Sequence, residues 1–176
     1  ANTKGGTILI GVDDRGEITG VEGYLEEEFW LNQAVEEICI PTVNINIELL
    51  HISKKDVLIV RVPEAETKPV YLKGKTKRQV LVRVDEENVE ASDERIEIMK
   101  NSSSKDGVTF EYGKNEQSLF RFLNEYSDIT VERFSRLIHV TTFRASRILV
   151  DLVSAGVLDV FIKDGVEHYT FSNKSA

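Results

Sequence analysis

The sequence opens with Asn2-Thr3-Lys4-Gly5-Gly6-Thr7 and continues directly into Ile8-Leu9-Ile10-Gly11-Val12, and this stretch decides the fold of the first part of the chain. Two adjacent glycines permit a backbone with positive φ and a close approach by another group. The apolar β-formers that follow predict a buried strand. Turn residues at 13–16 precede a second short apolar run at 18–21, so we expect a β-hairpin. For the glycine pair, a bend with a ligand and a bend without one both remain open.

A family resemblance rests on this stretch and on a later one. Asn2 to Thr7, Ile10-Gly11-Val12-Asp13-Asp14 and Gly16 are similar to the signature of the Schlafen-type AlbA-like domain, also called a divergent AAA domain. The later residues that fit the same pattern are Pro69-Val70-Tyr71-Leu72-Lys73, Val82-Arg83-Val84, Asn88 and Ala91. The resemblance covers roughly residues 1–100 and implies a nucleic-acid-binding domain with a mixed sheet and helices, whose motif residues here are Asn2, Gly5, Gly6, Asp13 and Asp14.

Composition is ordinary for a soluble globular protein of one or two domains. The 176 residues are 41% apolar and 30% charged, which argues against extended disorder. No apolar run approaches the length of a membrane span, and no secretory signal is visible. The single Cys39 excludes an internal disulfide and is interpreted as a core residue. We therefore expect a cytoplasmic protein. Members of the resembling family usually carry a glutamate-containing segment before this point, so a chain that starts at Ala1 is expected to be a fragment.

The net charge of -8 is unusual for a nucleic-acid-binding protein, so its distribution matters. Residues 1–100 hold 13 Lys and Arg against 20 Asp and Glu, whereas residues 101–176 hold 9 against 10. Most of the acidity therefore belongs to the first part of the chain.

Periodicity predicts the elements of the first part. Apolar positions in 26–38 predict an amphipathic helix packed on a sheet, with Trp30 in the core. Strands are expected at 43–50 and 57–62, with a turn at 53–56 between them. Ser92 is expected to cap a further helix. The polar, turn-rich residues that follow predict a linker at 101–113.

One basic stretch stands out in the first part. Between positions 68 and 83 there is no acidic residue, and the six basic residues are Lys68, Lys73, Lys75, Lys77, Arg78 and Arg83. With Tyr71 among them, the stretch suits a phosphate backbone and a stacked base; a solvated hairpin edge protected by lysines is the alternative. Gly74-Lys75-Thr76 is no P-loop, because Pro69 stands where that motif needs glycine. We expect no cofactor.

The segment 114–176 predicts three helices and a hairpin. Asn115 and Thr130 are expected to cap the first two helices, and the third is expected from about Thr142 to Ala155, ending at Gly156. An Asp-Gly turn at 164–165 predicts a hairpin. This order resembles a winged helix-turn-helix domain, in which the third helix enters the major groove and the hairpin touches the flanking backbone.

The candidate DNA-contacting residues lie around the third helix. Those at its start are Thr141, Thr142, Arg144, Ser146 and Arg147, where base-edge readers are expected, and Arg133 and Arg136 would add backbone contacts. Between positions 130 and 150 the sequence has four arginines and a single acidic residue, Glu132. The alternative is a winged helix that contacts protein, with these arginines merely solvated.

An enzymatic alternative comes from the same family resemblance. Some Schlafen members are metal-dependent RNA endonucleases that use clustered carboxylates, and Asp13 or Asp14 matches one of these positions. The partner glutamates would precede this sequence, so a role in a turn is favoured for both aspartates. The scattered His51, His139 and His168 predict no zinc site.

Together these observations predict a two-domain α+β protein, with a Schlafen AlbA-like domain at 1–100, a linker at 101–113 and a winged helix at 114–176. We expect a DNA-binding transcription regulator of bacterial type rather than an enzyme. A Schlafen-type nuclease and a protein-interaction module are the alternatives. DNA is the expected partner, RNA a second one, and a homodimer would suit both domains; no membrane partner and no metal are expected.

Overall fold

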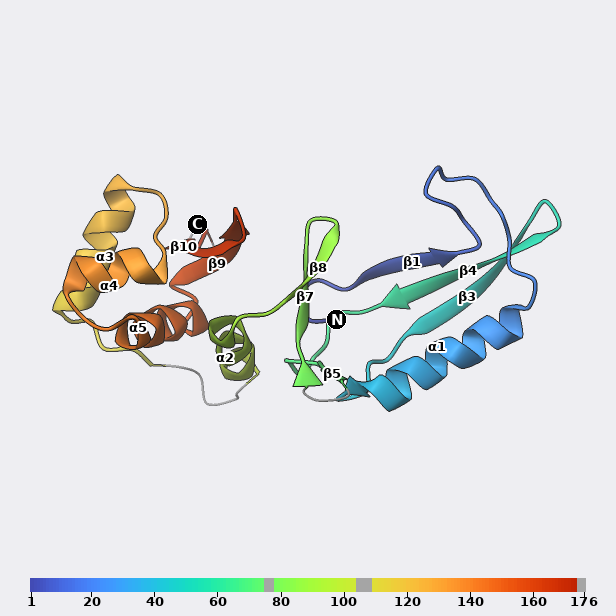
Figure 1. Ribbon diagram of the computed structural model, residues 1–176, viewed down its shortest axis with the longest axis horizontal. Coiled ribbons are helices and arrows are strands. Elements are labelled where there is room, and N and C mark those ends of the chain that lie inside the picture. Colours follow the sequence, from blue (N-terminus) through green and yellow to red (C-terminus); the bar gives the residue numbers. More distant parts are fainter. Residues whose placement is uncertain (75–77, 104–108, 174–176) are drawn as a thin grey trace. The chain divides into compact units, whose positions relative to one another are not determined.

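The computed structural model describes residues 1–74, 78–103 and 109–173. The chain forms two compact units, Ala1–Ala91 and Ser92–Ala176 (Figure 1). The elements of the first are β1 (Gly6–Ile10), α1 (Tyr24–Ile38), β2 (Cys39–Ile40), β3 (Asn46–Ile52), β4 (Lys55–Val62), β5 (Tyr71–Lys73), β6 (Arg78–Gln79), β7 (Leu81–Val84) and β8 (Glu87–Glu90). Those of the second are α2 (Asp93–Ser102), α3 (Lys114–Glu125), α4 (Val131–Ile138), α5 (Thr142–Ser154), β9 (Leu158–Lys163) and β10 (Val166–Phe171). The expected α+β class is confirmed. The strand pairs of the described residues are all antiparallel, so the expected mixed sheet was wrong.

The main sheet of the first unit has the strand order β1-β4-β3 (Figure 1). β3 and β4 form a hairpin closed by Ser53 and Lys54, both at positive φ. The central strand β4 carries the core residues Val57, Leu58 and Val60, which are almost completely buried. Both strands were predicted from the alternating and apolar runs, although β3 begins three residues later than expected.

β1 corrects two expectations. It is an edge strand that pairs with β4, with Ile8 opposite Val60, and its residues Ile8 and Leu9 are about half exposed rather than buried. The expected local hairpin is reduced to an isolated bridge between Val12 and Ile18. The physical reason is that all five residues of β1 can pair with β4 in a continuous antiparallel ladder. The short segment that follows the turn at 13–16 cannot provide such a ladder.

Helix α1 confirms the predicted helix but not its burial. None of its residues is buried, and Trp30, expected in the core, is 55% exposed. Leu25 and Phe29 are also exposed. Apolar residues occupy more of the circumference of α1 than its contacts with β2, β4 and β5 can cover. Periodicity identified the helix but not how much of it is covered by neighbours.

The remaining strands of the first unit form two small sheets. β2, β5 and β6 make one, and β7 and β8 make the other. β7 and β8 are joined by Asp85 and Glu86, within the acidic turn expected there. Val70 and Val80, which precede β5 and β7, are buried and belong to the core of the unit.

The second unit has a core to which α3, α4, α5 and the β9–β10 hairpin all contribute. Its buried members are Leu119, Leu123, Ile129, Phe134, Ala145, Leu149, Leu152, Leu158 and Tyr169. Asp164 and Gly165 close the hairpin with positive φ at both positions, which suits the twist of the strands. An isolated bridge between Ile129 and Tyr169 joins the loop before α4 to β10. The expected three helices and hairpin are confirmed.

Helix starts follow local cap chemistry. A hydroxyl oxygen accepts a hydrogen bond from the backbone N–H three residues later at Ser92, Thr130 and Thr141. The expected cap at Asn115 was wrong, because α3 begins at Lys114 with Gly113 as its N-cap. Glu116 Oε2 accepts from the Gly113 backbone N–H at 2.8 Å and supplies the cap instead.

Helix α2 packs against α5 within the second unit. It extends to Ser102, so part of the region expected as a linker is helical. Residues 104–108 of that region lie outside the described residues.

Candidate nucleic-acid interface

Asn2 anchors the N-terminal segment of the first unit. Its Nδ2 donates to the carbonyl oxygens of Val70 and Leu81, each at 2.9 Å, and its Oδ1 accepts from the Val70 backbone N–H at 2.7 Å. One side chain thereby joins the segment before β5 to β7. Both polar atoms of Asn2 are used in holding the fold together.

Thr3 continues the same connection. Its Oγ1 accepts from the Arg83 backbone N–H at 3.1 Å, and its carbonyl oxygen accepts from Lys68 Nζ at 3.2 Å. Lys68 also forms an ion pair with Glu64 at 2.5 Å, and this hydrogen bond holds the pKa of Glu64 below its usual value. Lys68 is therefore engaged within the unit rather than directed only at solvent.

The close approach expected at the glycine pair occurs at Gly5, and the chain itself makes it. Gly5 has φ +71°, and a Cβ built on it would lie 2.4 Å from the carbonyl oxygen of Val62. Gly6 is in β1, and nothing lies within 4 Å of a Cβ built there. The bend therefore serves chain packing at Gly5, while Gly6 faces open space.

The described part of the basic stretch places charge beside an aromatic ring. Lys73 in β5 pairs directly with Arg78 in β6, and both side chains are exposed. The Arg78 guanidinium lies 5.9 Å from the centre of the Tyr71 ring. Lys75 and Lys77 lie outside the described residues. Lys73, Arg78 and Tyr71 together form a small basic and aromatic surface on the first unit.

The predicted DNA-contacting residues of the second unit separate into two groups. Thr142 and Arg144 are exposed in the first turn of α5, and the Thr141 hydroxyl is used as the helix cap. Ser146 and Arg147 face helix α2 instead. Ser146 Oγ donates to Glu94 Oε1 at 2.8 Å, and the Arg147 guanidinium forms an ion pair with the Glu97 carboxylate.

A second carboxyl competes for Arg147. Asp151 lies one turn further along α5, and burial raises its pKa, with Arg147 acting in the opposite direction and Glu97 reinforcing the rise. The charge of Arg147 is thus shared between acidic neighbours on two helices. The positive potential of α5 is concentrated at Arg144 in its exposed first turn.

Arg133 and Arg136 lie on α4 and are exposed. The Arg133 guanidinium lies over the rings of Phe122 and Tyr126, at 4.6 and 5.2 Å from their centres. These rings stack with their centres 4.7 Å apart. Arg133 is therefore fixed by aromatic contacts, whereas Arg136 projects from the last turn of α4.

Comparison with known families bears on the first unit. The family model described as Schlafen, AlbA_2 matches residues 1–92. The chain belongs to the Schlafen AlbA_2 family. No curated protein and no solved structure matches the chain. The match ends where the second unit begins, so it speaks for the first unit alone and supports a nucleic-acid-related function there.

The two aspartates after β1 in this Schlafen AlbA_2 chain differ in their surroundings. Asp13 Oδ1 accepts from the backbone N–H groups of Arg15 at 2.9 Å and Glu17 at 2.8 Å, which closes the turn after β1. Asp14 is exposed. Across the described residues, no three or more His, Cys, Asp or Glu side chains lie close enough together to hold a metal ion between them. Asp13 is a turn residue, as the sequence indicated.

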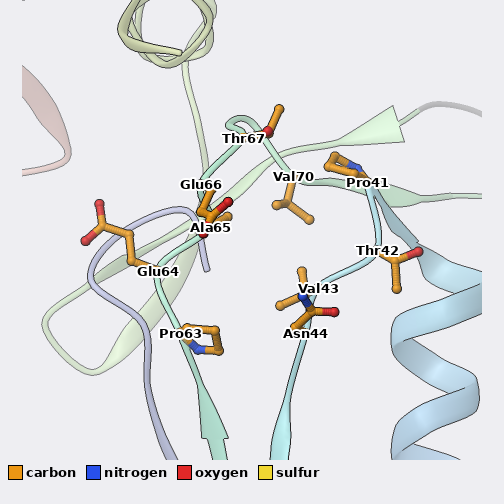
Figure 2. A pocket seen from close by; sticks show the side chains of 10 residues that line it. All are labelled: Pro41, Thr42, Val43, Asn44, Pro63, Glu64, Ala65, Glu66, Thr67 and Val70. Carbon is orange, nitrogen blue, oxygen red and sulfur yellow. The ribbon is translucent and has the colours of Figure 1, made fainter.

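A pocket of about 250 Å³ lies in the Schlafen AlbA_2 unit beside the end of β4 (Figure 2). Its lining residues are Pro41, Thr42, Val43, Asn44, Pro63, Glu64, Ala65, Glu66, Thr67 and Val70. Figure 2 shows Val43 and Pro63 on opposite sides of the space, on the two chain segments that flank it. Two carboxylates and no basic residue line this pocket, so its charge is unsuited to a phosphate.

The acids that meet α5 had no local signal in the sequence. Glu94 and Glu97 stand about 50 residues before their partners on α5. The spacing of the two acids, three residues apart on a capped helix, could have shown only that they share one side of that helix. Of the helices in the described ranges, none is both long and apolar enough to cross a membrane.

Proposed function

We propose that this Schlafen AlbA_2 chain binds nucleic acid, and that its second unit is a winged helix-turn-helix domain that reads duplex DNA in a transcription regulator of bacterial type. The observation that carries the proposal is the exposed first turn of α5, with Thr142 and Arg144. This helix follows α4 after a three-residue turn at 139–141. In helix-turn-helix domains, the second of two such helices places its N-terminal residues against base edges.

The charges near this turn support the proposal. Arg144 and Arg136 are exposed at the facing ends of α5 and α4, and an arginine suits either guanine or a phosphate. The β9–β10 hairpin takes the position of a wing in the order of elements, although Asp164 in its turn is unfavourable near phosphate.

The first unit supports a second contact with nucleic acid. Lys73 and Arg78 supply charge for the phosphate backbone, and Tyr71 supplies a ring on which a base can stack. RNA or single-stranded DNA suits this surface, because its bases are available for stacking. A homodimer would offer two copies of α5 to two half-sites on a duplex.

The test is a binding titration across a salt series, followed by fluorescence anisotropy. The probes are a labelled DNA duplex of about 20 base pairs, which is two helical turns, and a single-stranded RNA of matching length. We compare the wild type with Arg144→Ala and with Arg121→Ala, an exposed arginine of α3.

We expect duplex affinity to fall steeply with salt, and Arg144→Ala to weaken it and to reduce the salt slope by about one. Arg121→Ala should leave both the affinity and the slope unchanged. If nothing binds at low salt, the proposal fails. The exposed apolar side chains of α1 then make protein contact the next function to test.

A further inference from the structure

We propose that helix α2 competes with nucleic acid for helix α5, so that the DNA-reading face of the second unit is held closed from within. The inference rests on the proposed function and concerns its regulation. Polar contacts join α2 to α5: Glu94 accepts a hydrogen bond from the Ser146 hydroxyl at 2.8 Å, and Glu97 forms an ion pair with Arg147. Carboxylate and phosphate oxygens bind the same donors in the same way. The acids of α2 therefore occupy groups of α5 that a phosphate would otherwise bind.

The second observation is that the cover extends along the helix. Ser146, Val150 and Ser154 recur every four residues and thus lie on one face of α5. Ser154 Oγ accepts from Asn101 Nδ2 at 3.1 Å, and Asn101 lies in the last turn of α2. Val150 is completely buried, yet it lies outside the core cluster that contains Ala145. Since two neighbours on its face bond to α2, the cover over Val150 is α2.

The apolar side of α2 agrees with this arrangement. Ile98 and Met99 are each 8% exposed, and both lie outside the core cluster of the second unit. The core side of α5 carries Ala145, Leu149 and Leu152, so the face under α2 is turned away from that core. This outward face is the one that a recognition helix needs for the major groove.

The dimensions of the two helices prevent the covered face of α5 from reaching the groove. The major groove of B-DNA is about 12 Å wide and admits a single α-helix. A helix with its side chains has a diameter of about 10–12 Å, so the groove has no room for α2 between the base edges and the face of α5 that carries Ser146 and Val150. Full insertion of α5 requires that α2 leave this face. With α2 in place, the first turn, with Thr142 and Arg144, stays exposed, and Arg147 keeps about half of its side chain accessible.

The contacts that hold α2 are of two kinds. The Arg147–Glu97 pair is partly exposed, with 49% and 36% of the side chains accessible, so an ion pair of this kind is weak and exchangeable. The Arg95–Glu167 pair, at 3.0 Å and about 15% exposed, ties the start of α2 to β10. A phosphate can replace Glu97 at Arg147, and its negative field repels Glu94 and Glu97 together. Nucleic acid therefore both competes for α5 and weakens the hold of α2.

The experiment combines a double-mutant cycle with hydrogen exchange on the full chain. Duplex affinity is measured by anisotropy for the wild type, Glu97→Gln, Arg147→Ala and the double variant. Glu125→Gln, an exposed acid of α3, removes the same charge away from α5 and is the matched control. Hydrogen exchange of the α2 amides is then compared with and without duplex, after thermal melting has established that each variant is folded.

We expect Glu97→Gln to raise duplex affinity about threefold or more, because it frees one charged phosphate contact. The gain should vanish in the Arg147→Ala background and be absent in Glu125→Gln. The α2 amides should exchange faster in the complex. An unchanged affinity, an equal gain without Arg147, or α2 amides that exchange no faster in the complex would overturn the competition.

The two proposals fail in distinguishable ways. If the wild type binds duplex through Arg144 and Glu97→Gln changes nothing, DNA binding stands and competition by α2 is wrong. If no variant binds, including Glu97→Gln, both fail together.

Discussion

Replacing Gly5 by alanine should destabilise the first unit, while the same change at its neighbour Gly6 should not. Gly5 has φ +71°, and an added Cβ would lie 2.4 Å from the carbonyl oxygen of Val62 and 2.8 Å from backbone atoms of Pro63 and Glu64. These are backbone atoms, which cannot rotate away as a side chain can. Gly6 lies in β1, and a Cβ there meets nothing within 4 Å.

The magnitude follows from two costs. The left-handed backbone costs about 1–2 kcal/mol for a residue with a Cβ. Forcing an extra carbon into a filled space costs about 1–3 kcal/mol more. Gly5→Ala should therefore lower the free energy of unfolding by about 2–5 kcal/mol. Gly6→Ala should leave it unchanged or raise it by about 0.5 kcal/mol, because alanine in a strand loses less backbone entropy than glycine.

The assay is urea unfolding followed by tryptophan fluorescence. Trp30 is the single tryptophan and lies in the first unit, so its signal reports on that unit alone. The midpoint should fall for Gly5→Ala at an unchanged slope, and Gly6→Ala should match or exceed the wild type. Equal midpoints for the two variants would refute the packing argument at Gly5.

Three further substitutions test single contacts. Asn2→Ala removes three hydrogen bonds and should cost about 2–3 kcal/mol in the same fluorescence assay; a loss below about 0.5 kcal/mol would contradict its anchoring role. Thr141→Ala removes the cap of α5 and should cost about 1 kcal/mol, seen as faster hydrogen exchange of the α5 amides, whereas Thr142→Ala should have little effect. Burial raises the pKa of Asp151, so its ionised form costs stability above that pKa, and the wild-type free energy of unfolding should fall relative to Asp151→Asn as pH rises from about 4 to 7. The free energy of unfolding of both proteins is measured by urea unfolding across this range. If their difference stays constant with pH, or changes in the opposite direction, Asp151 is not desolvated.

The features of the fold that could be predicted from the sequence are mostly those set by local chemistry. Ser92 and Thr130 were identified as caps because the bond they make spans only three residues, whereas Thr141, which caps α5 in the same way, was assigned to DNA contact. The Asp-Gly turn of the β9–β10 hairpin was likewise predictable, since both residues tolerate positive φ. The order of three helices and a hairpin was predicted from these helix caps and turn residues. The winged helix itself and its DNA contacts stay predictions.

What depended on distant partners was not predictable. β1 was expected to pair locally, but its ladder is with β4, whose paired residues lie about 50 positions further along the chain. Trp30 has a core-like position in the helical pattern, and only the extent of its neighbours decides that it is exposed. Arg147 was predicted to contact DNA, but it forms an ion pair with Glu97. Glu97 lies on a helix that the sequence analysis assigned to the first domain.

The exposed apolar side chains of α1 affect how the protein behaves in concentrated salt. Leu25, Phe29 and Trp30 are each more than half exposed, and the net charge of -8 is what keeps molecules apart in dilute buffer. Salt screens that repulsion over about 10 Å at 0.1 M, while apolar attraction persists. The conditions that release nucleic acid are therefore also those that favour self-association. Light scattering recorded alongside the salt series separates the two, because a falling anisotropy reports release only where the scattering stays flat.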